Sequence, residues 1–185
     1  FLTVSLLEKK GYDPMAYRLF CLQSHYRKNL VFTWENLDNA VIAYNKLIAK
    51  IATFKNDGDV DQAAFDNMKN RFQKALDGDL NTSVAVTALY DVLKAKCNDA
   101  TKLALIADFD YVLSLNLLAA AEALNKKKAE EEAANADPVI DGLVAERTAA
   151  KKAKNFAEAD RIRDELKAMG VEIIDTPQGT KWRKV

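Results

Sequence analysis

Apolar side chains recur every three or four residues along most of this 185-residue chain, the spacing of one face of an α-helix. The clearest run follows Thr33, a residue type that caps helices. Its apolar positions are Leu37, Ala40, Val41, Tyr44, Leu47, Ile48, Ile51 and Phe54. Glycine and proline are rare, with six and three residues, and most of them fall between such runs. The pattern predicts long amphipathic helices joined by short polar turns, which is typical of a helical bundle.

Four further helices are predicted before residue 114. One begins at Asp13-Pro14, a cap residue followed by proline at the first helical position, and an extended connection follows it. After a turn at 56–59, the next carries a predicted inner face of Val60, Ala63, Ala64, Met68, Phe72 and Leu76. Asn81 or Thr82 caps the third, with a stripe of Val86, Leu89, Tyr90, Leu93 and Cys97, and the fourth covers about 102–113.

Residues 125–136, NKKKAEEEAANA, have no large apolar side chain. They are good helix formers or polar residues, so we predict a solvated helical linker. A basic block at 126–128 is the alternative interpretation. Three glutamates follow at once, however, and favour ion pairs at i,i+4 spacing along one exposed helix.

Beyond the linker, Asp137-Pro138 repeats the helix-start signal, and that helix should run to about Lys152. Asn155 caps a second helix, with Glu158 at the capping-box position. Its predicted inward residues are Phe156, Ala159, Ile162, Leu166 and Met169. Gly170 ends the helix, and a strand at 171–175, a turn at 176–179 and a strand at 180–185 follow. The predicted fold class is therefore mainly α, a helical bundle followed by a small αα-plus-β-hairpin mini-domain.

Composition narrows the function classes. Apolar residues make up 49% and charged residues 29%, which argues against disordered, collagen-like and disulfide-scaffold proteins. The 27 basic and 27 acidic residues cancel, which argues against bulk electrostatic binding of nucleic acid. Two distant cysteines and a single histidine, His25, make a zinc site improbable and suit a reducing cytoplasm. No apolar run is long enough to span a membrane. The first residue is Phe rather than Met, so we expect this sequence to be an excised piece of a longer chain.

No enzyme signature is present: the sequence has no phosphate-binding glycine loop, no Gly-x-Ser-x-Gly and no His-Glu-x-x-His. His25 is interpreted as structural or ligand-positioning rather than catalytic. Lysines cluster at the inter-helix turn at 151–154, and basic residues flank Trp182. Basic groups beside an exposed aromatic suit unpaired RNA bases. Phe156 is either a core or a stacking residue, and Trp182 is more typical of a packing anchor.

Four segments resemble cysteinyl-tRNA synthetases, in the order of that family. They are YRLFCLQSHYR (17–27), LDGDLNT (76–82), NFAEADRIRD (155–164) and DTPQGTKWR (175–183). The last two are similar to the carboxyl-terminal tail of the family, and LDGDLNT resembles the start of a helix in its anticodon-binding bundle. The matches span essentially the whole chain.

The resemblance implies the carboxyl-terminal tRNA-binding fragment of a class I ligase that attaches cysteine to tRNA(Cys) using ATP. ATP and zinc are expected only in an amino-terminal catalytic domain, so this fragment should have no cofactor and no activity alone. The implied parts are a stem-contacting junction (1–32), an anticodon-binding bundle (33–124), the linker (125–136) and an anticodon-recognition mini-domain (137–185). The implied partners are tRNA(Cys) and the catalytic domain of the same chain. A cytoplasmic monomer without membrane contact is expected.

Site residues follow from the same resemblance. Asp160 and Asp175 match carboxylates that lie near the anticodon bases, and Phe156 matches an aromatic that stacks on a base. Lys151 stands where an arginine is common in the family, and a lysine does not make the bidentate contact that an arginine makes. Trp182 and Arg183 complete the implied surface. Contacts to the tRNA backbone are expected from Lys152, Lys154, Arg27 and Lys28.

Two alternatives stay open from the sequence. The helix at 156–164 also resembles a helical-hairpin motif that excision-repair proteins use for protein contact, although that motif explains only residues 143–168. Composition alone also allows a helical protein-interaction adaptor with no role in nucleic-acid binding.

Overall fold

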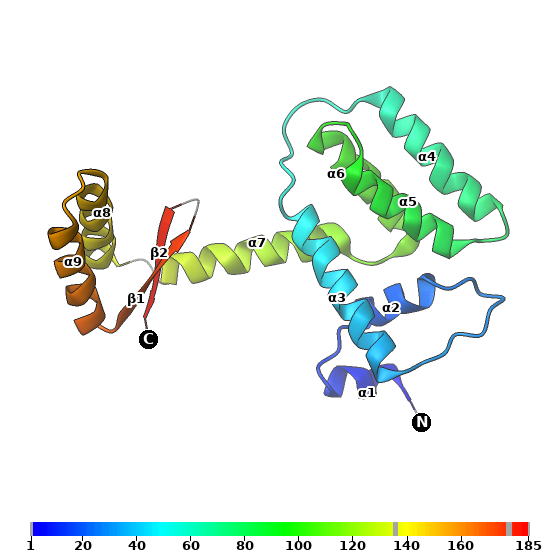
Figure 1. The fold of residues 1–185 in the computed structure, drawn as a ribbon. Coiled ribbons are helices and arrows are strands. Elements are labelled where there is room, and N and C mark those ends of the chain that lie inside the picture. Colours follow the sequence, from blue (N-terminus) through cyan, green and yellow to red (C-terminus); the bar gives the residue numbers. More distant parts are fainter. Residues whose placement is uncertain (1, 135–136, 177–178, 185) are drawn as a thin grey trace. The chain divides into compact units, whose positions relative to one another are not determined.

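A computed structural model describes residues 2–134, 137–176 and 179–184 (Figure 1). Within these ranges the chain forms nine helices and one two-stranded sheet, so the predicted mainly α class with a small hairpin is confirmed. The chain divides into two compact units, residues 1–126 and 127–185. The boundary falls within the helix α7 (Leu117–Ala134).

The first unit is helical. Its elements are α1 (Val4–Lys9), α2 (Pro14–Leu22), α3 (Trp34–Ile51), α4 (Gln62–Asp77), α5 (Thr82–Lys94), α6 (Asp99–Leu113) and α7 (Leu117–Ala134). The predicted caps Asp13, Thr33 and Asn81 each accept a hydrogen bond from a backbone N–H in the first turn. The short α1 was not predicted, because only Leu7 of its six residues is buried and no apolar period is visible.

The core of the first unit lies between α2, α3, α4, α5, α6 and the start of α7. The rings of Phe72 and Phe109 stack there with centroids 4.0 Å apart. Tyr44 is almost fully buried, and its hydroxyl donates to the Leu115 carbonyl at 2.7 Å, which satisfies its polar group. Burial raises the pKa of Tyr44 to about 12. Beside it, the Asp110 carboxylate accepts from the N–H groups of Leu115 and Leu117 and so holds the turn from α6 into α7.

The predicted inner faces of two helices in the first unit were wrong in part. Val60 and Ala63 are both exposed, and Val60 precedes α4, because Asp61 caps that helix and it begins later than the apolar pattern suggested. Phe65 and Ala75 lie inward instead. Cys97 was placed on the stripe of α5, but that helix ends at Lys94.

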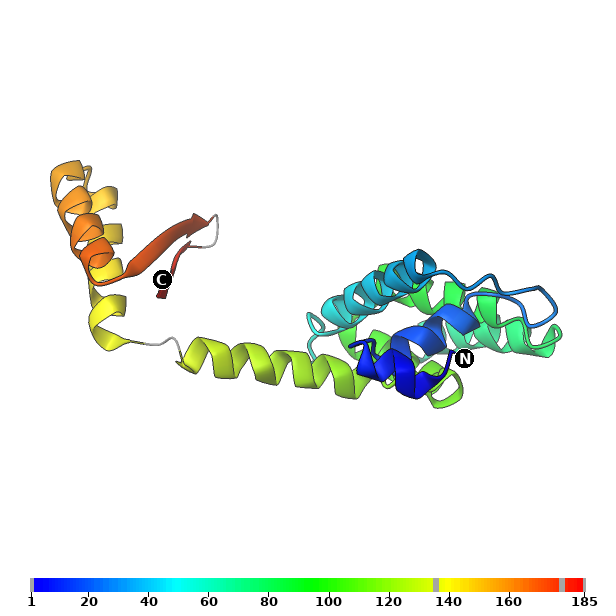
Figure 2. The same ribbon diagram turned by 90° about the horizontal axis from the view of Figure 1, so that it is seen from below.

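After the end of α7, the second unit consists of α8 (Pro138–Lys152), α9 (Phe156–Ala168) and the antiparallel strands β1 (Val171–Thr176) and β2 (Gly179–Lys184). The helices α8 and α9 lie side by side, as Figures 1 and 2 both show. A small core of Ile140, Val144, Ile162, Leu166 and Val171 joins the helices to β1. Gly170 ends α9 with φ of 73°, a backbone conformation that favours glycine.

Sequence and structure differ at several positions in this unit. Phe156 and Met169 are 62% and 47% exposed, so they are not core residues of α9. The capping box is half formed: Asn155 accepts from the Glu158 N–H, but the Glu158 carboxylate accepts from Arg161. The helix and the i,i+4 ion pairing predicted for the linker are confirmed in its described part. Residues 125–134 form the end of α7, and Lys127 pairs with Glu131. The other two linker residues, 135 and 136, and the turn residues 177 and 178 lie outside the described ranges.

Candidate nucleic-acid interface

The Asp175 carboxylate connects β1 to α8. Arg147 donates to it through both terminal nitrogens, at 3.1 Å from Nη1 to Oδ1 and 3.2 Å from Nη2 to Oδ2. Lys151, one turn further along α8, donates to Oδ2 at 2.6 Å. Thr180, its partner residue on β2, donates to Oδ1 at 2.9 Å. A carboxylate offers about four acceptor sites, so these four donors occupy Asp175 fully.

The environment of this carboxylate is strongly cationic. Hydrogen bonds from Arg147, then from Lys151 and Thr180, hold the pKa of Asp175 well below its usual range. The Arg147 side chain is only 9% exposed, whereas Asp175 is about half exposed. The Arg147 Nε–H is buried and has no acceptor within the described ranges. Asp175 is thus a surface carboxylate held in place by a buried cation.

Sequence reasoning did not assign a role to Arg147. A signal was present: Arg147 continues the spacing of the buried residues Ile140 and Val144 on α8, so a charged residue occupies an inward helical position. A buried cation requires a partner. The spacing therefore indicated a buried ion pair, but not which carboxylate takes part in it.

The other predicted base-contacting residues of α9 are exposed. Phe156, the first residue of the helix, presents most of its ring to solvent. Asp160 is 63% exposed, and its Oδ1 pairs with Arg163 Nη1 at 3.0 Å. Its Oδ2 has no hydrogen-bond or ion-pair partner among the residues with described side chains, so it remains an available acceptor. This end of α9 offers a stacking surface and a hydrogen-bond acceptor on one helix.

The predicted backbone-contacting lysines lie at the turn between α8 and α9. Lys152 and Lys154 are both exposed. The Lys154 N–H bonds to the Lys151 carbonyl and the Asn155 N–H to the Ala150 carbonyl, the two bonds of a Schellman motif. Lys154 has φ of 57° at the position of this motif where glycine is usual. A lysine therefore holds a left-handed conformation in the middle of the basic turn.

The two predicted residues of β2 are engaged elsewhere. Trp182 packs against the small core, and its Nε1–H donates to Asp141 at 2.7 Å. Arg183 pairs with Glu172, its neighbour across the hairpin. The structure therefore brings Lys151 directly onto Asp175, whereas Trp182 and Arg183 contact neither of these residues through a described hydrogen bond.

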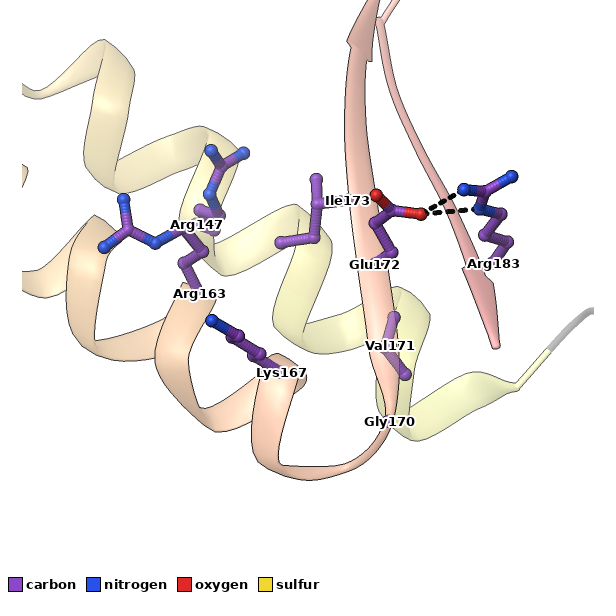
Figure 3. Close-up of a pocket in the computed structure, with 8 residues that line it drawn as sticks. All are labelled: Arg147, Arg163, Lys167, Gly170, Val171, Glu172, Ile173 and Arg183. Atoms are coloured by element: carbon purple, nitrogen blue, oxygen red, sulfur yellow. Dashed lines mark hydrogen bonds and ion pairs between the residues drawn. The ribbon is translucent and has the colours of Figure 1, made fainter. Parts of the chain in front are cut away.

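An open pocket of about 760 Å³ lies along this unit (Figure 3). We call it the α9–β1 groove, and it is lined by Arg147, Arg163, Lys167, Gly170, Val171, Glu172, Ile173 and Arg183. In Figure 3 the side chains of Arg163 and Lys167 extend from α9, and Ile173 points from β1 toward the helices. The lining thus combines four cationic side chains with one carboxylate and a short apolar floor.

In the first unit, the two segments singled out by sequence meet. Tyr26 and Arg27 both donate to Asp79 Oδ1, at 2.7 and 3.0 Å, and the Thr82 hydroxyl donates to the Ser24 carbonyl. The ring of His25 stacks on the exposed Tyr26. Arg27 and Lys28 remain exposed on this surface, with Arg27 oriented by Asp79.

These features define a class: a helical protein with a small, basic, carboxylate-bearing surface of the kind that contacts unpaired RNA. Comparison with known proteins is more specific. Residues 135–183 match the family described as cysteinyl-tRNA ligase anticodon binding domain, so the second unit belongs to that family. The resemblance to cysteinyl-tRNA synthetases is thereby confirmed.

Similarity extends beyond that domain. The chain is 38% identical to a cysteine–tRNA ligase of Novosphingobium aromaticivorans, over 99% of this chain and 38% of the relative. It is 35% identical to one of Burkholderia lata, over 98% of this chain and 36% of the relative. It is 37% identical to one of Caldicellulosiruptor saccharolyticus, over 100% of this chain and 42% of the relative. The chain thus spans about two fifths of the length of these relatives.

Among the described residues, no single helix is long and apolar enough to cross a membrane. The same residues contain no group of three or more His, Cys, Asp and Glu side chains placed to hold a metal ion.

Proposed function

We propose that this chain is the anticodon-binding part of a cysteinyl-tRNA synthetase and that its second unit reads unstacked anticodon bases of tRNA(Cys). The observation that carries the proposal is the pair of exposed carboxylates, Asp160 and Asp175, held by arginines beside a basic turn in an anticodon-binding domain. Carboxylates accept hydrogen bonds from base amino and imino groups, and the basic turn attracts the phosphates between those bases.

Phe156 supplies the stacking surface. An exposed ring at the start of a helix has no role in the core, and stacking of a base on an aromatic side chain contributes about 1–3 kcal/mol. Every base has a flat face, so this contact contributes affinity but little discrimination. Discrimination is assigned to the carboxylates.

Asp160 and Asp175 have different parts in this proposal. Asp160 Oδ2 accepts from a base directly. Asp175 has four donors already, so a base must replace one of them. Lys151 is the exchangeable donor because it is 43% exposed and has a long flexible stem, whereas Arg147 is buried. Released from Asp175, the Lys151 ammonium becomes available to a phosphate. Trp182 anchors β2 in this scheme, and Arg183 holds its position at the edge of the surface.

The first unit extends the contact along the tRNA. Arg27 and Lys28 are assigned to the tRNA stem, and Lys152 and Lys154 to the backbone near the anticodon. The whole protein, in this proposal, attaches cysteine to tRNA(Cys) with ATP, and ATP and zinc bind in its catalytic domain. The two free thiols, Cys21 and Cys97, agree with work in the cytoplasm, and a monomer is proposed.

The test is binding of the 185-residue chain to tRNA(Cys) and to the same tRNA with altered anticodon bases, across a series of salt concentrations. We expect tighter binding to the unaltered tRNA, with a discrimination that persists as salt rises. Equal affinity for both would contradict anticodon reading. Absence of salt-dependent binding to either would favour a protein-interaction adaptor or an excision-repair type of hairpin.

A further inference from the structure

Charge in the α9–β1 groove is only partly compensated. Arg183 pairs with Glu172 across the hairpin, and Arg163 pairs with Asp160 and Asp164, which do not line the groove. Lys167 has no ion-pair or hydrogen-bond partner among the residues with described side chains. An uncompensated ammonium therefore faces a groove large enough for a ligand.

The groove is continuous with the proposed base-reading surface. Arg147 lines it and also holds Asp175, and Arg163 lines it and also pairs with Asp160. The same two arginines thus connect the groove to both carboxylates. A strand whose base contacts Asp160 or Asp175 has a direct path for its neighbouring nucleotide into the groove.

The floor of the groove favours a nucleotide over a free ion. Val171 is buried and Ile173 is partly buried at the start of β1, and Gly170 beside them has no side chain. A sugar packs against such an apolar surface while its phosphate faces the cations at the rim. A small inorganic anion gains only the second of these contacts.

We propose that the α9–β1 groove binds the phosphodiester of the nucleotide next to the base that Asp160 or Asp175 reads, with Lys167 as the principal phosphate contact and Arg163 beside it. This inference rests on the proposed function and adds a site to it. The alternative role of Lys167 is structural, because cations in the last turn of a helix are favoured by the helix dipole.

Lys74 supplies the matched control, since it is an exposed lysine in the last turn of α4 in the other unit. Lys167→Gln and Lys74→Gln each remove one charge from the end of a helix. The 185-residue chain and both variants are titrated with a cysteine anticodon stem-loop RNA at several salt concentrations, and thermal unfolding confirms that each variant folds. A second stem-loop with changed anticodon bases is titrated in parallel.

We expect Lys167→Gln to lower the slope of log affinity against log salt by about 0.7, the value for one contact to a single-stranded phosphate, equally for both RNAs. Lys74→Gln leaves the slope unchanged. An unchanged slope in Lys167→Gln overturns the phosphate contact even if the wild-type chain still discriminates between the RNAs. If the wild-type chain binds both RNAs equally, base reading is contradicted. The salt slope of Lys167→Gln still tests the phosphate contact in that case. A wild-type chain that does not bind RNA overturns both.

Titration with inorganic phosphate identifies the source of the phosphate group. The backbone amide signals of Gly170 and Val171 are followed by NMR during addition of the stem-loop and, separately, of inorganic phosphate. We expect saturable shifts with the RNA and none with equimolar inorganic phosphate. Equal shifts from both ligands would identify a free-anion site and overturn the assignment to an RNA phosphodiester.

Discussion

The guanidinium of Arg147 meets the carboxylate of Asp175 with two parallel hydrogen bonds, and the arginine is buried whereas the aspartate is half exposed. This asymmetry has a consequence for stability, because the two residues are not equivalent when one is removed. Loss of Asp175 leaves a cation without its partner in the interior. Loss of Arg147 leaves a carboxylate that water and Lys151 still satisfy.

We predict that Asp175→Ala lowers the free energy of unfolding of the second unit by about 1–3 kcal/mol and that Arg147→Met lowers it by less than about 1 kcal/mol. Urea unfolding, followed by Trp182 fluorescence in a Trp34→Phe background, measures both. Equal losses in the two variants would show that the cation is not desolvated as its burial indicates.

Acid should weaken the contact between α8 and β1. The pKa of Asp175 is depressed in the folded chain, so its stabilisation is complete above the unfolded value of about 3.9 and disappears as pH falls toward the lower, folded value. We therefore expect the stability difference between wild type and Asp175→Asn to be constant near neutral pH and to shrink below about pH 4. A difference that shrinks instead between pH 5 and 7 would assign the effect to another group.

The ring of Phe156 should matter for binding and not for folding. We expect Phe156→Ala to weaken binding of the anticodon stem-loop by about 10- to 100-fold, the loss of one stacked base. Because the ring is exposed, the free energy of unfolding of Phe156→Ala should differ from that of wild type by under about 0.5 kcal/mol. Met169→Ala is the control, since Met169 is a similarly exposed apolar residue near the other end of α9. A large loss of stability with unchanged affinity would make Phe156 a packing residue.

Lys154 gives a case in which stability and binding should move in opposite directions. Glycine relieves the strain of its left-handed backbone but adds freedom to the unfolded chain, so we expect Lys154→Gly to stabilise the second unit by about 0.5 kcal/mol. Affinity for RNA at low salt should fall in both Lys154→Gly and Lys154→Asn, because each removes the charge. If Lys154→Asn binds as tightly as wild type, the lysine does not contact phosphate.

The sequence predicted the second unit closely because its signals are local. Asp137-Pro138, Asn155 and Gly170 specify where each helix begins or ends through their own backbone and side-chain chemistry. The exposure of Phe156 and Met169 could not be predicted from local signals in the same way. Both continue the apolar spacing of α9, but the core is small and is filled by Ile162, Leu166 and the residues of α8 and β1.

The candidate site depended on contacts that sequence does not encode locally. Asp175 lies 28 residues from Arg147 and 24 from Lys151, and only the folded hairpin brings these three side chains together. Family resemblance named Asp160, Asp175 and Lys151, but it gave no indication that Asp175 is already fully hydrogen-bonded. For that reason the proposed function assigns direct base reading to Asp160 and treats Lys151 as the donor that a base would displace from Asp175.

Asp160→Asn tests the central claim most directly, because it preserves shape while converting one acceptor oxygen into a donor. The quantity to measure is the ratio of affinities of the 185-residue chain for the cysteine anticodon stem-loop and for a stem-loop with changed anticodon bases. The account predicts a ratio well above one in wild type that falls by about 10-fold or more in Asp160→Asn, corresponding to one good base contact. A ratio that is the same in both proteins would contradict base reading by this carboxylate.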